Sequence, residues 1–420
     1  MTETDNNTHN QSPQGAFHWP SALQLGFSLL TTLALWSLAA TLFVGGFVGQ
    51  YLQGFSPYEV LQYFLLAGGA ALCGFLLLPA SFFAFRRLAG RPQKQFLLLP
   101  GWLRPTLLIF ALPVLLLFGS WIYQQEQFAW LILPPVHALA IGLPIMWFVY
   151  LAIRNLSSAS PQRHWGVFST GLVLAPALSF FIEILVVITL LFAWSVWIST
   201  QPDLMRDLTN LAQRLEQARI SPEEFLALLQ PYIAQPAVIF AILGFFTLVV
   251  PLVEETIKPV GVWLLANRNL SPADGFAAGV LSGAGFALAE SLALASSGGD
   301  WALAVFTRIG TGTIHILASG LVGWALARAW GNGKYLQLGA SYVLAVLIHS
   351  AWNLLSILLA LSYVPDMISM MGESRLLSIQ GGLIPYLLGL FALIAFISLL
   401  VINRALNRQK DRLAVHSTVV

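Results

Sequence analysis

The chain has 420 residues, of which 57% are hydrophobic and only 9% are charged. This composition excludes a soluble globular domain and is typical of an all-α polytopic membrane protein, because long apolar segments cross a bilayer as helices. The formal net charge of +2 and the single cysteine, Cys73, indicate neither nucleic-acid binding nor a disulfide framework.

The N-terminal segment is polar and contains no lysine or arginine before the first apolar stretch. A cleaved signal peptide needs a basic region ahead of its apolar core. We therefore predict a disordered polar tail at residues 1–22, followed by a first helix that is retained.

About ten apolar segments follow, each near the ~20 residues that span hydrocarbon. The first five form a predicted five-helix N-terminal region at 23–198. In the sixth segment, Pro251 and Pro259 are each able to kink or break the helix. The predicted spans are 23–49, 60–85, 105–123, 130–153, 166–198, 236–266, 272–297, 301–328, 335–362 and 382–403.

Basic residues predict the orientation of these spans, because Lys and Arg concentrate in cytoplasmic loops. With ten spans, fourteen of the twenty basic residues lie on one side of the membrane and only four on the other. We therefore predict a multi-pass protein of the cell (inner or plasma) membrane with both termini cytoplasmic. Residues 404–420 form its basic cytoplasmic tail.

One sizeable loop, residues 199–235, falls on the outer side. Its segment DLMRDLTNLAQRLEQA has apolar residues at helical spacing, and Ser221-Pro222-Glu223-Glu224 fits a second helix start. We expect an extracytoplasmic loop of two amphipathic helices on the outer surface. A solvated connector and a substrate-gating element both fit this pattern.

Ionisable residues stand inside the later spans, where each costs a few kcal/mol and so indicates a functional site. A helical rise of ~1.5 Å per residue places Glu254, His315 and His349 at a similar depth on three helices. Carboxylates and histidines at one level are the parts of a water-activating centre. The ionisable residues considered for the site are Glu254, Glu255, Lys258, Glu290, Arg308, His315 and His349.

Structural roles are the alternative for most of these residues. A single membrane histidine often serves as an interhelical hydrogen-bonding residue, and Glu290 with Arg308 fits a buried ion pair. Glu183 and His137 have no motif around them and are interpreted as structural or pore-lining. The adjacent pair Glu254–Glu255 is harder to explain structurally, because two buried carboxylates repel each other.

A glycine face accompanies these residues in the seventh span. Gly275, Gly279 and Gly283 form a GxxxGxxxG pattern, which permits close contact with a neighbouring helix.

The motifs of these spans resemble those of the PrsW family of intramembrane proteases, within the group that includes the CAAX-prenyl endopeptidases. The resemblance covers about the last 185 residues and implies a PrsW-like catalytic membrane domain at 236–403. Two positions depart from many PrsW-like sequences: Asn353 stands where Asp is expected, and Ser291 where Asn is frequent. The matching pieces are EETIK (Glu254, Glu255, Lys258), GAGFALAE (Phe286, Glu290), the lone His315, and HSAWN (His349–Asn353).

The resemblance implies an intramembrane endopeptidase that cleaves a membrane-embedded or membrane-proximal peptide bond in an anti-sigma-factor-like or other single-span membrane protein. Glu254 is the expected general base, and Glu255, held by Lys258, is expected to orient the motif. His315 and His349 either bind a metal or, with Asn353, stabilise the oxyanion. The expected supporting residues are Lys258, Phe286, Glu290 and Arg308.

Metal content and partners stay open at this point. His315 and His349, with Glu290 or Glu254 as third ligand, fit a Zn²⁺ site, whereas a glutamate–histidine centre needs no metal. The oligomeric state is not indicated. An ion-coupled transporter and a non-catalytic membrane scaffold are the alternative functions, because intramembrane charges serve transport equally well.

Overall fold

A computed structural model describes residues 17–92, 105–156, 159–217, 235–293, 301–361 and 375–419. Every regular element in these ranges is helical, which confirms the predicted all-α fold. Nine helices of the described part are long and apolar enough to cross a membrane. Another apolar helix, α3 (Pro105–Tyr123), matches the third predicted segment.

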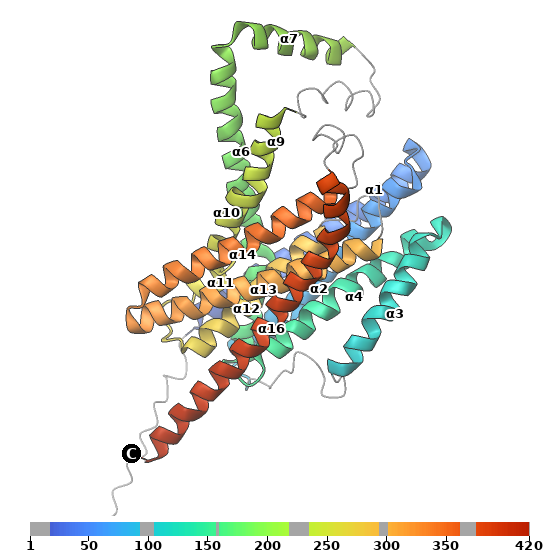
Figure 1. Cartoon of the computed structure of the whole chain (residues 1–420). Helices are drawn as coiled ribbons and strands as arrows, with labels where there is room; N and C mark the ends of the chain where they lie inside the picture. Colours follow the sequence, from blue (N-terminus) through green and yellow to red (C-terminus); the bar gives the residue numbers. More distant parts are fainter. Residues whose placement is uncertain are drawn as a thin grey trace, which may run out of the picture.

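The helices follow the predicted segments in order (Figure 1). Those of the N-terminal half are α1 (Trp19–Val48), α2 (Pro57–Leu88), α3, α4 (Glu126–Ile153), α5 (Pro161–Ser169), α6 (Ala175–Ser199) and α7 (Pro202–Gln217). Those of the C-terminal half are α9 (Pro236–Gly244), α10 (Val250–Ile257), α11 (Val260–Trp263), α12 (Pro272–Ala293), α13 (Trp301–Asn332), α14 (Tyr335–Leu361) and α16 (Arg375–Val419).

Three short π-helical segments interrupt the spans: η1 (Gly49–Gln53), η2 (Thr170–Leu174) and η3 (Phe245–Val249). Segment η2 joins α5 to α6, and η3 joins α9 to α10, so each pair forms one continuous span. Single π turns inside α-helices are frequent at functional sites. Here η3 directly precedes α10, the helix that carries Glu254 and Glu255.

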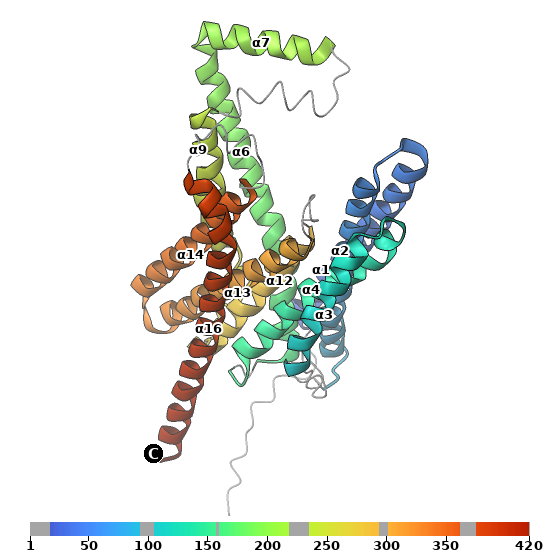
Figure 2. The same ribbon diagram turned by 45° about the vertical axis from the view of Figure 1, so that its right-hand side comes forward.

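The N-terminal helices pack mainly as two hairpins, α1 with α2 and α3 with α4 (Figure 2). At the start of α2, Ser56 and Glu59 form a capping box that satisfies free backbone N–H groups. Helices α2, α4 and α5 also contact α12. The N-terminal region therefore supports the helix that carries Glu290.

Helices α12 and α13 are the innermost spans, with 83% and 89% of their apolar windows buried. The predicted glycine face makes their contact close. A Cβ atom on Gly279 would overlap the Ser319 carbonyl oxygen, and one on Gly283 would lie 2.6 Å from the His315 carbonyl oxygen. This approach holds the Glu290 and His315 backbones at a fixed separation.

The segment after the fifth span turns sharply away from α6 as helix α7 (Figures 1 and 2). It is the first of the two helices predicted for loop 199–235, and the second falls outside the described residues. At the C-terminus, α16 continues through the predicted basic tail as far as Val419.

Candidate active site

The carboxylates of the site lie at the end of a helix. The Lys258 N–H donates to the Glu254 carbonyl oxygen at 2.7 Å, and the chain then turns at Pro259 into the short helix α11. Pro251 lies near the start of α10, directly after η3, and the helix passes through it. Of the two prolines considered from the sequence, Pro259 is therefore the one at which the helix ends.

The Lys258 side chain is fully buried and its ammonium lies at the centre of the site. Its Nζ atom donates to Glu255 Oε1 at 2.8 Å and lies 2.8 Å from His315 Nδ1. It also lies 2.8 Å from Glu254 Oε2 and 3.3 Å from His349 Nδ1. One cation thus contacts both adjacent carboxylates, which relieves the repulsion expected between them.

Hydrogen-bond bookkeeping assigns the histidine tautomers. An ammonium has no lone pair, so His315 Nδ1 accepts from Lys258 and its Nε2–H donates to Glu290 Oε2 at 2.6 Å. The three N–H groups of Lys258 face three nearer acceptors at 2.8 Å, so its 3.3 Å approach to His349 Nδ1 is not a hydrogen bond in this assignment. An ionised carboxylate only accepts, so the 2.9 Å contact with Glu255 Oε1 then places a proton on His349 Nδ1. The remaining nitrogen, His349 Nε2, carries a lone pair and lies 3.7 Å from Glu254 Oε2.

Glu290 joins this centre to a second cation. Its Oε1 lies 3.3 Å from an Arg308 nitrogen, the ion pair considered from the sequence, and its Oε2 contacts His315. The Glu290 and Arg308 side chains are each more than a quarter exposed, whereas His315 is fully buried. Glu290 therefore lies at the border of the centre and accepts a hydrogen bond from Nε2 of His315.

Phe286 closes one side of the centre. Its ring centroid lies 4.7 Å from Lys258 Nζ, within the range of a cation–π contact. The same ring meets the His315 imidazole edge to face, with centroids 5.5 Å apart. Phe286 thus packs against both the ammonium and one of its acceptors.

Asn353 is placed differently from the other candidate residues. It lies one turn beyond His349 on α14, and its Nδ2 donates to the Phe246 carbonyl oxygen of η3 at 2.9 Å. The Asn353 residue is half-buried. In this structure Asn353 joins α14 to η3, and no sequence motif indicates this contact.

The two ionisable residues without a motif have separate environments. His137 accepts a hydrogen bond from Trp301 Nε1 at 3.2 Å, which supports a structural role. Glu183 lies on α6, which packs against α10. It interacts electrostatically with Glu254 and Lys258. Its Oε1 is buried and has no hydrogen-bond partner among the described residues. Sequence reasoning missed this proximity, because the motif residues all lie later in the chain.

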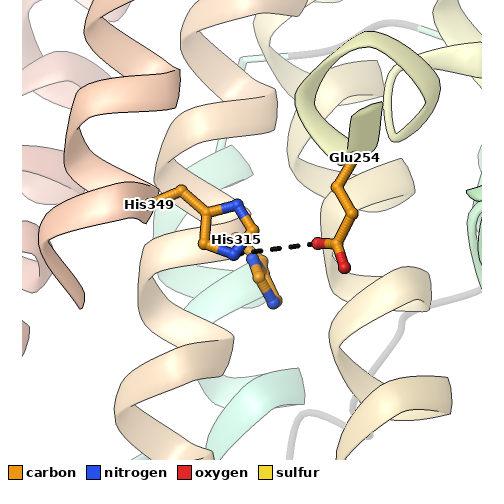
Figure 3. Close-up of side chains that lie close together, drawn as sticks. All are labelled: Glu254, His315 and His349. Atoms are coloured by element: carbon orange, nitrogen blue, oxygen red, sulfur yellow. Dashed lines mark ion pairs between the residues drawn. The ribbon is translucent and has the colours of Figure 1, made fainter. Parts of the chain in front are cut away.

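Three residues lie close enough to hold a metal ion. Donor atoms of Glu254, His315 and His349 are all within 4.8 Å of one another, and Figure 3 shows their side chains facing a common point. Imidazole and carboxylate ligands suit Zn²⁺. However, His315 already uses both ring nitrogens, and the Lys258 ammonium stands among the same donors. The donor types fit a metal, but the Lys258 ammonium occupies the cage, that is, the space between the donor atoms of Glu254, His315 and His349.

These helices and their buried charged centre define a polytopic membrane protein with an intramembrane carboxylate–histidine site. Residues 221–372 match the model of the PrsW family of intramembrane metalloproteases. This match confirms the resemblance inferred from the motifs, and it spans every residue of the centre. No curated protein and no solved structure matches the chain. The family implies a peptide hydrolase of the membrane that acts on membrane proteins.

Proposed function

We propose that this protein is an intramembrane endopeptidase in which Glu254 activates a water molecule to cleave a peptide bond of a single-span membrane protein. The observation that carries the proposal is the close approach of Glu254 Oε2 and His349 Nε2, 3.7 Å apart, within the region that matches the family. Both atoms are acceptors in the tautomers assigned above. A water molecule beside this pair of atoms would donate one hydrogen bond to each of them.

Burial distinguishes Glu254 from Glu255. The Glu254 side chain is 11% exposed, whereas that of Glu255 is 0% exposed. The Glu254 Oε2 atom is itself buried and faces the Lys258 ammonium at 2.8 Å, a contact that uses one of its two lone pairs. A partly exposed carboxylate with one lone pair left for water is what a general base requires. Glu255 instead orients His349 and Lys258.

The proposed reaction follows from these positions. The water oxygen attacks the peptide carbonyl carbon while Glu254 takes the proton. The carbon–nitrogen bond then breaks as Glu254 returns this proton to the leaving amine. His349 Nε2 takes the second proton of the same water and then donates it in a hydrogen bond to the carbonyl oxygen that becomes negative. This proton also passes to the leaving amine, so the products are a carboxylate and an ammonium. Asn353 Nδ2 becomes a second donor only where it leaves the Phe246 carbonyl. No step requires a metal.

The remaining residues of the centre position these groups. Lys258 lies 2.8 Å from Glu254 Oε2 and balances the charge of this carboxylate. His315 is fully buried with both nitrogens engaged, so it fixes Lys258 and does not contact the substrate in this assignment. The catalytic residues proposed are Glu254 and His349, and the positioning residues are Glu255, Lys258, Phe286, Glu290, Arg308 and His315.

A cleavage assay tests the proposal. The purified protein is incubated in lipid vesicles with a panel of tagged single-span membrane proteins, and the products are identified by mass spectrometry. Glu254→Gln should reduce cleavage by about 10²–10⁴-fold, the usual contribution of a general base. Asp203→Asn, an exposed carboxylate of α7, is the control and should retain activity. Wild-type cleavage rates in the Glu254→Gln protein would reject the mechanism.

A further inference from the structure

We propose that Lys258 is the resident cation of this centre, and that its ammonium and a divalent metal ion are alternative occupants of one cage. The inference concerns the same residues as the proposed protease but does not depend on the reaction. It disagrees with the description of the matching family as metalloproteases.

The position of Nζ is the first argument. Three acceptors, Glu254 Oε2, Glu255 Oε1 and His315 Nδ1, each lie 2.8 Å from it. An ammonium has three N–H donors, so its donor capacity matches this set. A metal bound to Glu254, His315 and His349 would need to occupy the space between the same donor atoms. The ammonium and the ion therefore exclude each other.

The surroundings of Lys258 are the second argument, because they suit an ammonium. The Phe286 ring 4.7 Å from Nζ attracts a cation by its quadrupole, but a phenyl ring is not a ligand for Zn²⁺. The backbone of Lys258 is also held in place. Its N–H donates to the backbone carbonyl oxygen of Glu254, and its own carbonyl oxygen accepts from Ser282 Oγ at 2.5 Å. The lysine is thus anchored at both its backbone and its side-chain end.

Charge is the third argument. With neutral imidazoles, the carboxylates of Glu254, Glu255 and Glu290 face the cations of Lys258 and Arg308, which leaves one net negative charge. Removal of the lysine charge leaves two negative charges and frees His315 Nδ1 as a ligand. A neutral residue at position 258 therefore turns the cage into a site whose charge and donors match a divalent ion.

The test replaces Lys258 with a neutral side chain of similar length. Full-length wild type, Lys258→Met and the control Lys334→Met, which alters an exposed lysine after α13, are purified and washed with chelator. Each is exposed to zinc chloride and desalted, and its zinc is measured by mass spectrometry. We expect about one zinc per chain in Lys258→Met and only traces in the other two proteins. Adding His315→Ala or His349→Ala to Lys258→Met should abolish this uptake.

Thermal stability gives a second readout without substrate. Zinc should raise the melting temperature of Lys258→Met, because a ligand that binds only the folded state stabilises it, and should leave the wild type unchanged. If the Lys258→Met protein does not fold, Lys258→Gln takes its place. The zinc content of the wild type also tests the inference without any variant. A wild type that retains about one zinc per chain, lost with His315→Ala, would overturn it. So would a folded Lys258→Met protein that takes up no zinc. Neither result contradicts peptide cleavage, which the assay with Glu254→Gln measures separately.

Discussion

His315 Nε2 lies 2.6 Å from Glu290 Oε2, and this contact joins the two innermost helices, α12 and α13, at the edge of the buried centre. The other oxygen of Glu290 faces Arg308 at 3.3 Å. Glu290 therefore has two functions in the fold: it neutralises Arg308, and it holds the ring of His315, whose opposite nitrogen accepts from Lys258. A change at Glu290 should affect both stability and catalysis.

Two substitutions separate these functions. Glu290→Gln removes the charge that orients His315, and a hydrogen bond to a charged group is worth about 1.5–3 kcal/mol. We expect kcat to fall by about 10- to 100-fold, together with a lower melting temperature. Arg308→Met keeps the His315 contact and should lower the melting temperature with a much smaller loss of kcat. Equal losses of kcat in the two variants would show that Glu290 serves only the ion pair.

The two α14 residues proposed from the sequence should differ in their contributions. His349→Ala removes the imidazole that faces Glu254 and should reduce cleavage by about 10²–10⁴-fold. Asn353→Ala removes a contact with the Phe246 carbonyl and should reduce it less than about 10-fold, because a neutral hydrogen bond contributes only about 0.5–1.5 kcal/mol. Steady-state cleavage rates in vesicles measure both. A loss in Asn353→Ala as large as that in His349→Ala would place the amide on the oxyanion.

The sequence predicted the spans and the residues of the centre, but not their contacts. Apolar length and helical rise place Glu254, His315 and His349 at a similar depth, since both depend on the local chain alone. The rotation of each helix depends on packing between distant segments, so nothing local indicated that Lys258 would contact both histidines. For the same reason, the sequence did not predict that Asn353 donates to a carbonyl oxygen of η3. It also did not predict that Glu183, on a helix that precedes the family match, lies near the centre.

Close packing of α12 against α13 should be sensitive to a single methyl group. Gly279→Ala forces the added Cβ against the Ser319 carbonyl, and overpacking of this kind costs about 1–3 kcal/mol. The matched control is Gly339→Ala in α14, where a Cβ meets nothing within 4 Å and alanine favours the helix by about 0.5–1 kcal/mol. Melting temperatures in detergent should therefore fall for Gly279→Ala and stay level or rise for Gly339→Ala. A Gly279→Ala protein as stable as the wild type would show that these two helices can separate.

Membrane orientation is the last prediction, and it follows from the order of the spans. Ala89, directly after α2, and Asn210, on α7, are both exposed, and three predicted membrane segments lie between them: α3, α4, and α5 with α6. An odd number of spans places them on opposite sides of the membrane, and the distribution of basic residues assigns Ala89 to the cytoplasm. Single cysteines at these positions, in a Cys73→Ala background, are labelled with an impermeant maleimide in intact cells and in lysed cells. Asn210→Cys should react in intact cells and Ala89→Cys only after lysis. The reverse pattern would invert the orientation, and labelling of both in intact cells would contradict the arrangement of the three spans.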